Sequence, residues 1–91
     1  MTYTIKETTQ FRKDYKRIMK RGRDRRVLAL VINHLAQGKK LDPSYRDHAL
    51  TGDYAGQREC HLAPDWLLVY VIDHEVLVLS LMRTGSHSDL F

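Results

Sequence analysis

The run from Trp66 to Ile72 most constrains the fold, because it is apolar on both of the faces that a strand presents. It is far too short to cross a membrane, which takes about 20 apolar residues. Turn-forming residues bound it on both sides, as they bound a short buried strand. Residues 66–72 therefore predict the central strand of a sheet.

The segments on either side of this run predict two neighbouring strands. Residues 57–62 alternate, with Cys60 and Leu62 on one face and Glu59 and His61 on the other. Short turns lead from this segment into the central strand and from there into residues 76–84, which form a third apolar stretch. Consecutive hairpins of this kind make an antiparallel sheet.

The N-terminal part of the chain predicts one strand followed by two helices. Residues 2–8 alternate loosely, as a strand does. Thr9 can cap a helix that ends at Gly22, and Asp24 can cap a second helix that ends at Gly38. Each helix has an apolar stripe, formed by Phe11, Tyr15, Ile18 and Met19 in the first and by Val27, Leu28, Val31, Ile32 and Leu35 in the second. Because the turn between them is short, we expect an antiparallel helical hairpin.

These elements define an α+β fold of order β-α-α-β-β-β. We expect a single domain, residues 1–91, in which the N-terminal helical hairpin covers one face of an antiparallel sheet. The opposite face is then free to form a concave site. Residues 39–55 show no clear period and predict a long loop, and such loops are often functional.

The charge of the chain is unevenly distributed. The net charge is +4, but twelve of the 15 Lys and Arg residues lie within residues 1–40, against three acidic residues. Such a concentration favours a polyanionic partner, although a solvated helix face would look similar. The candidate contacts to nucleic acid are the densely packed Lys13, Lys16, Arg17, Lys20 and Arg21.

Cysteine content and hydropathy indicate a reduced, cytoplasmic protein without a membrane anchor. Cys60 is the single cysteine, which excludes an intrachain disulfide, and residues 1–8 lack the apolar region of a signal peptide. Cys60 faces the predicted core and would be a poor nucleophile. No glycine-rich phosphate loop is present, and we expect no cofactor.

Three histidines lie at the edges of apolar runs, beside short polar motifs. They are His48, His61 and His87, and strand alternation directs His61 away from the helix-covered face. Histidine can both accept and donate a proton near neutral pH. With Asp65 and Arg83 added, the chain has a base, an acid and a fixed cation, which are the groups needed to cleave RNA through its own 2′-hydroxyl.

Each of these residues also has a plainer structural interpretation. Arg83 lies in an apolar strand and needs a partner, which could be Asp65, Asp89 or a bound anion. Trp66 packs in the core by default, but it could offer a stacking surface to an unstacked base. The histidines and Asp65 could ligate zinc, but the sequence has no close-spaced ligand pair of the kind that zinc motifs contain, so we expect no metal.

The motifs around these residues resemble those of one protein family. They are HALTG at 48–52, GQRECHLAPDWLLVY at 56–70 and RTGSHSDLF at 83–91. Together they resemble the YafQ family of bacterial type II toxins, within the RelE/ParE superfamily. The resemblance is dense from residue 46 to the end and looser in the helices, and the element order derived above agrees with the RelE-like fold.

The resemblance implies a ribosome-dependent endoribonuclease that cuts messenger RNA in the decoding site. It implies a cognate antitoxin, usually of the ribbon-helix-helix type, that neutralises the toxin and binds operator DNA. The catalytic set of the family matches His48, His61, Asp65 and His87, and the positions that line its site match Arg83, Trp66 and Phe91.

We assign His87 as the general acid and either His61 or Asp65 as the base, with Arg83 neutralising the phosphorane and His48 positioning the phosphate. Two alternatives remain. ParE-like relatives inhibit DNA gyrase by binding alone, and a basic RNA-binding module would need no chemistry. Either alternative leaves the histidine set without a purpose.

Overall fold

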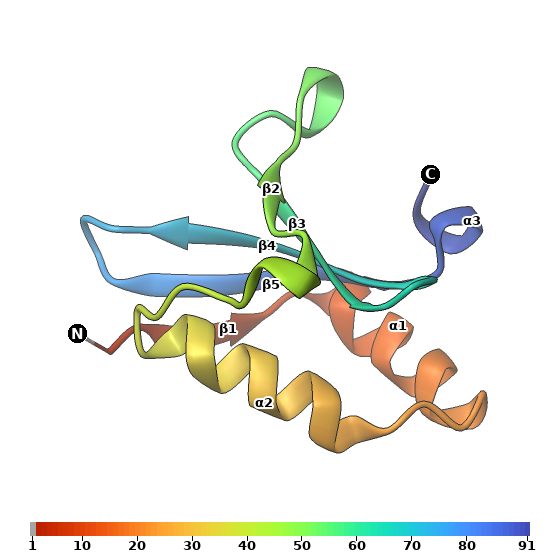
Figure 1. Ribbon diagram of the computed structural model, residues 1–91. Coiled ribbons are helices and arrows are strands. Elements are labelled where there is room, and N and C mark those ends of the chain that lie inside the picture. Colours follow the sequence, from red (N-terminus) through yellow and green to blue (C-terminus); the bar gives the residue numbers. More distant parts are fainter. Residues whose placement is uncertain (1) are drawn as a thin grey trace.

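The computed structural model describes residues 2–91 and shows a five-stranded sheet with two long helices on one face (Figure 1). In chain order the elements are β1 (Thr4–Glu7), α1 (Thr9–Lys20), α2 (Arg25–Ala36), the 3-10 helix η1 (Pro43–Tyr45), β2 (His48–Ala49), the 3-10 helix η2 (Gly52–Tyr54), β3 (Arg58–Ala63), β4 (Trp66–Asp73), β5 (Val78–Gly85) and α3 (His87–Leu90). The predicted α+β class and the order of the main elements are confirmed. Among the described residues, no helix has the length and hydropathy of a membrane span.

The sheet has the strand order β1-β5-β4-β3-β2, with β4 at its centre as predicted. Strands β2 to β5 pair antiparallel, but β1 runs parallel to β5, from the pair Thr4↔Val78 to the pair Glu7↔Leu81. The expectation of a wholly antiparallel sheet is therefore wrong at this edge. Consecutive hairpins fix the directions of β3, β4 and β5 only, because the two helices separate β1 from the strand that it joins.

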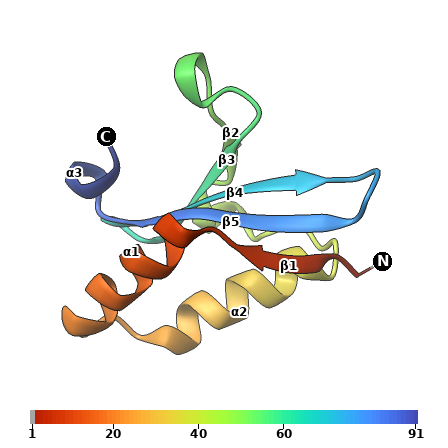
Figure 2. The ribbon, with the colours of Figure 1, turned by 180° about the vertical axis from the view of Figure 1, so that it is seen from behind.

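Both long helices begin at polar caps. The Thr8 side chain, one residue before the predicted cap, accepts a hydrogen bond from the Phe11 amide, and the Asp24 side chain accepts one from the Arg26 amide. The two helices diverge from the turn between them (Figure 2) and leave a groove of about 630 Å³ that Phe11 and Leu28 help to line. The two helices follow one another through a short turn on one side of the sheet, as predicted, but they do not pack closely against each other, and each packs on the sheet instead.

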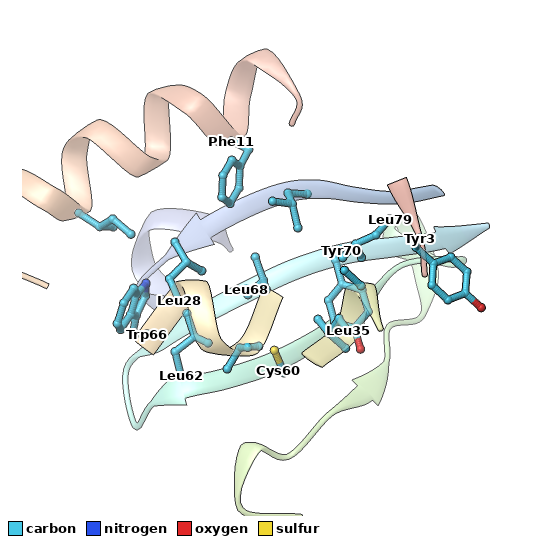
Figure 3. Packing of buried hydrophobic residues seen from close by; sticks show 14 residues of the cluster. Tyr3, Phe11, Leu28, Leu35, Cys60, Leu62, Trp66, Leu68, Tyr70 and Leu79 are labelled. Carbon is cyan, nitrogen blue, oxygen red and sulfur yellow. The ribbon is translucent and has the colours of Figure 1, made fainter. Parts of the chain in front are cut away.

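The main core lies between the helices and the sheet (Figure 3). Phe11 and Leu28 face Leu68 of the central strand, and Cys60 and Trp66 are buried in the same cluster. Burial raises the pKa of the Cys60 thiol to about 12, in agreement with the expectation that it is a poor nucleophile.

The opposite face of the sheet has a smaller cluster of Leu67, Val69 and Leu90, against which Leu50 and Met82 pack. Because Leu90 belongs to α3, this cluster fixes the end of the chain on the face away from the long helices (Figure 1). The last residues form a short helix, which the sequence analysis did not predict. The predicted loop 39–55 is likewise shaped by η1, β2 and η2.

Candidate active site

The three predicted histidines converge on the sheet face opposite the long helices. The ring centroid of His61 lies 6.2 Å from that of His48 and 5.7 Å from that of His87. His61 is therefore the middle member, and its side chain is 16% exposed, whereas His48 and His87 are exposed. Strands β2 and β3 and helix α3 each contribute one ring, so the cluster forms only when the chain folds.

His48 reaches the cluster because the short strand β2 is fixed on β3. It pairs with Glu59, and the preceding Asp47 accepts hydrogen bonds from Arg58 Nε at 3.1 Å and from the Tyr70 hydroxyl at 2.7 Å. His48 Nδ1 donates to the Arg46 carbonyl oxygen over 2.7 Å. A proton on Nδ1 leaves Nε2 of His48 as the atom that faces the site.

Asp65 fixes the orientation of His87. Its Oδ1 atom accepts hydrogen bonds from the backbone N of His87 at 3.0 Å and from Nδ1 of the same residue at 2.9 Å. These two hydrogen bonds hold the pKa of the Asp65 carboxyl below its ordinary value, and the bond from the backbone N has the larger effect. With Nδ1 bound to a carboxylate, Nε2 is the ring atom of His87 that can exchange a proton with substrate.

Helix α3, which presents His87, is fixed by a capping box and an ion pair. The Ser86 side chain accepts from the Asp89 amide, and the Asp89 carboxylate accepts from the Ser86 amide at 2.9 Å. Arg21, which caps the C-terminal end of α1, donates to both carboxylate oxygens of Asp89, at 2.6 and 3.2 Å. A Cβ atom at Gly85 would lie 2.9 Å from Asp89 Oδ2, so this close approach requires glycine.

Arg83 is bound to a residue that the sequence did not single out. Its Nε and Nη2 atoms donate to the two oxygens of Asp14, at 2.7 and 3.2 Å. The expected partners were Asp65, Asp89 or an anion, and the protein partner is neither of those two carboxylates. Asp14 is 1% exposed on the buried stripe of α1. The sequence did contain an indication of this role, because Asp14 is an acidic residue between Phe11 and Ile18 on an otherwise apolar stripe.

Glu59 is a second acidic residue beside the site that the sequence alone did not indicate. It is 5% exposed, and its Oε1 lies 3.5 Å from His48 Nε2 and 3.6 Å from His61 Nε2. The three ligand atoms lie within 4.8 Å of one another, so these residues could hold a metal ion. The expectation of no metal rested on spacing along the chain, and the fold joins residues that the sequence separates. The sequence could have indicated this contact, because Glu59 and His61 lie two residues apart on the same face of the predicted strand.

The two predicted substrate-lining aromatics differ in accessibility. Phe91 is 55% exposed and meets Tyr54 edge to face, with 5.1 Å between the ring centroids. Trp66 is 3% exposed, donates from Nε1 to Thr84 Oγ1 at 3.0 Å and has the Arg23 guanidinium over its ring. The structure therefore corrects the assignment of Trp66 as a substrate contact: it belongs to the core, which was its default interpretation.

The predicted basic surface of α1 divides into free and paired residues. Lys13, Lys16 and Lys20 are exposed. Arg17 donates to Asp14, and Arg21 is bound to Asp89. All five residues remain candidates for contact with nucleic acid, because the paired side chains of Arg17 and Arg21 are still 40% and 50% exposed.

Comparison with known proteins identifies relatives along the whole described chain. Residues 3–91 match the family described as a bacterial toxin of type II toxin-antitoxin system, YafQ. The mRNA interferase toxin YafQ of Escherichia coli strain K12 is 35% identical over 88 residues, which cover 96% of this chain and 94% of that protein.

Solved structures agree with this family match. A metal-bound toxin from Helicobacter pylori is 46% identical with a TM-score of 0.92, and each chain is covered completely. The chain in the E. coli DinJ-YafQ toxin-antitoxin complex is 34% identical with a TM-score of 0.90, over 100% of this chain and 99% of that one.

Proposed function

This chain belongs to the YafQ family of bacterial type II toxins, and on that premise we propose that it is an endoribonuclease that cleaves messenger RNA by 2′-hydroxyl attack. A base removes the 2′-hydroxyl proton, and the oxygen attacks the adjacent phosphorus. The bond from phosphorus to the 5′-oxygen breaks as an acid protonates that oxygen. The products are a 2′,3′-cyclic phosphate and a free 5′-hydroxyl.

The adjacency of His61 and His87, with Asp65 on the far side of His87, is the observation that supports this reaction most strongly. Asp65 orients the ring and stabilises its protonated form, so His87 Nε2 can donate a proton to the leaving 5′-oxygen. Because both hydrogen bonds of the Asp65 carboxylate go to His87, Asp65 serves better as the orienting group, and we assign His61 as the base.

The remaining site residues act on the phosphate. Arg83 keeps Nη1 free of hydrogen bonds to residues 2–91, and this donor can meet the charge that develops on the phosphorane. His48 Nε2 faces the same site and positions the phosphate. The exposed Phe91 and Tyr54 offer ring surfaces on which an unstacked base can lie.

The ribosome would supply what this small site lacks. Two exposed aromatic rings give little base recognition, and the catalytic histidines at the rim of the cluster are open to solvent. A ribosome-bound message would be held in an attack-ready geometry, and that ordering can contribute much of the rate. Lys13, Lys16 and Lys20 would contact ribosomal RNA through phosphate groups.

A cognate antitoxin would be the regulatory partner, as the E. coli relative is solved in complex with DinJ. We propose an antitoxin of the ribbon-helix-helix type, with the complex binding operator DNA through the antitoxin. A cytoplasmic location would place the toxin in the same compartment as the ribosome and the antitoxin.

The test is cleavage of a translated message by purified protein, with product ends mapped with and without ribosomes. We expect codon-phased cuts only on ribosomes, with 5′-hydroxyl ends, and no cut where the scissile nucleotide is 2′-deoxy. His87→Ala should lower the rate by about 10²–10⁴-fold. His34→Ala, which alters a histidine of α2, is the matched control.

Cleavage of the 2′-deoxy substrate at the normal rate would contradict the reaction. Equal cleavage of naked RNA at the same sites would contradict ribosome dependence alone. Intact RNA together with inhibited gyrase supercoiling would favour the ParE-like alternative.

A further inference from the structure

The edge of β5 changes its partner where β1 ends. The Thr8 amide donates to the Leu81 carbonyl, and the Thr8 hydroxyl donates to the carbonyls of Leu81 and Met82. Beyond this point β1 no longer pairs with β5, and α1 begins. Further along this edge of β5, the side chain of Asp14 stands where a strand partner would be. Its Oδ2 accepts a hydrogen bond from the Thr84 amide at 3.2 Å. Asp14 thus satisfies a strand amide that would otherwise be buried without a partner.

A register shift in the same stretch turns Arg83 toward the active site. Along β4 and β5, Tyr70 pairs with Leu81, whereas Val69 pairs with Arg83. The extra residue reverses the alternation, so Arg83 shares the face of Val69, which is the face of Glu59 and the histidines. Without the bulge, Arg83 would point to the helix-covered core like Leu81.

Asp14 binds the inner edge of the Arg83 guanidinium and leaves its outer edge free. Asp14 takes Nε and Nη2, while Nη1 has no hydrogen bond within the described chain. The carboxylate is itself held by Gln10 Nε2 at 3.0 Å and Arg17 Nη2 at 3.2 Å. Burial raises the pKa of Asp14, but the hydrogen bonds from Arg83, Gln10 and Thr84 outweigh it and lower the pKa overall.

We propose that Asp14 is a positioning residue for the cleavage reaction, which holds the guanidinium of Arg83 so that Nη1 meets the scissile phosphate. This inference rests on the proposed contact of Arg83 with that phosphate. A free arginine side chain loses rotamer entropy on being ordered. The Asp14 contact orders it in advance, so the benefit appears in the chemical step more than in substrate binding.

The test is a double-mutant cycle of Asp14→Asn and Arg83→Ala, with steady-state cleavage over a range of concentrations of ribosome-bound message as the readout. We expect Asp14→Asn to lower kcat about 10- to 100-fold with little change in KM. The double variant should be no slower than Arg83→Ala, because Asp14 acts through Arg83. Asp24→Asn, an acid-to-amide change at the cap of α2, is the control and should leave kcat unchanged.

The outcomes separate the two proposals. If Arg83→Ala is impaired and the double variant falls by the product of the two single effects, the positioning inference is overturned and the reaction stands. If Arg83→Ala keeps the wild-type kcat, the phosphate contact of Arg83 fails, and the inference fails with it.

A measurement on the wild-type chain covers the case in which Asp14→Asn does not fold, since the change removes the charge and one of the two acceptor oxygens that face the half-buried Arg83. Arginine ¹⁵N resonances can be followed while a short RNA with a 2′-deoxy scissile nucleotide is added until the His61 signal saturates. We expect the Arg83 Nη signals to shift while the Nε signal stays in place. The inference would be overturned if the Arg83 Nε signal moved to the chemical shift of the exposed Arg25. It would also be overturned if none of the Arg83 signals changed on addition of the RNA.

Discussion

Asp65, in the turn between β3 and β4, and His87, at the start of α3, are joined by two hydrogen bonds to a single carboxylate oxygen. One bond goes to the backbone N at the start of α3 and the other to the imidazole. The turn between β3 and β4 therefore fixes both the position of the short helix and the rotamer of its histidine. The carboxylate remains exposed, so the contact acts through geometry and charge at the surface.

Asp65→Asn should slow cleavage about 10²-fold or more while leaving the fold intact. The amide has no charge to stabilise a protonated His87, and its NH₂ group can present a donor to Nδ1. Single-turnover rates across a pH series provide the measurement, with Glu75→Gln at an exposed turn as the control. A wild-type rate for the variant would show that Asp65 only caps α3.

The pH dependence of this contact follows from the direction in which it shifts the pKa of Asp65. The pKa of Asp65 is lowered in the folded protein, chiefly by the His87 amide. Its stabilising contribution is therefore complete above the ordinary aspartate pKa of about 4 and is lost as the pH falls further. The loss of this contact at low pH should thus appear in the Glu75→Gln control as in the wild type, and Asp65→Asn should lack it.

Arg21→Ala should loosen α3 and slow cleavage about 10- to 100-fold without unfolding the sheet. The Arg21 contact, more than any other, lowers the pKa of Asp89, so this pair stabilises α3 at neutral pH and is lost on acidification below about pH 4. Amide exchange at Leu90 provides the measurement. Arg26→Ala removes a similar but remote pair with Asp24 and should change neither exchange nor rate.

Charge reversal at Lys13, Lys16 and Lys20 should weaken ribosome binding and flatten its salt dependence. Each lost phosphate contact lowers the slope of log affinity against log salt by about 0.7–0.9. The free energy of unfolding should change little, because these side chains are exposed. Reversal of Lys39 and Lys40, on a different surface, is the control. If both sets weaken binding equally, the lysines of α1 have no specific place in the complex.

The spacing of apolar residues predicted most of the fold, because it is regular along the main strands and helices. The run at 66–72 specified the central strand, and the stripes of 10–36 specified both helices. The direction of β1 could not be predicted, because no hairpin connects it to β5. Strand β2 pairs through two residues only, a length that periodicity does not detect.

The histidine cluster followed from motif composition, but its supporting acids did not. Asp14, Asp47 and Glu59 are common surface residues by type, and only the folded contacts show that each accepts hydrogen bonds from, or lies against, a site element. Arg83 was expected to need a partner, and it has one. The choice of Asp14 over Asp65 or Asp89 depends on where α1 crosses the edge of β5, which the sequence does not state.

Zn²⁺ should bind the cluster of His48, Glu59 and His61 and inhibit cleavage, because the same imidazole atoms cannot hold a metal and exchange protons with substrate. Calorimetry with Zn²⁺ alone and cleavage rates before and after chelation provide the measurements. Glu59→Gln should weaken Zn²⁺ binding at least about tenfold, since it removes the one anionic ligand. His34→Ala should bind as the wild type does, and loss of binding there would place the ion elsewhere.

Trp66→Phe should separate the structural from the substrate-stacking interpretation of this tryptophan. The change removes the hydrogen bond from Nε1 to Thr84 Oγ1 and leaves a smaller ring in the core. We expect the free energy of unfolding to fall by about 1–2 kcal/mol, measured by denaturant titration. Because Trp66 is 3% exposed beneath Arg23, kcat and KM should remain near wild type at a temperature where the variant is folded. Phe91→Ala is the counterpart, since that ring is 55% exposed, and its KM should rise while its stability is kept. If Trp66→Phe instead raised KM as Phe91→Ala does, the tryptophan would have to leave the core to meet the substrate.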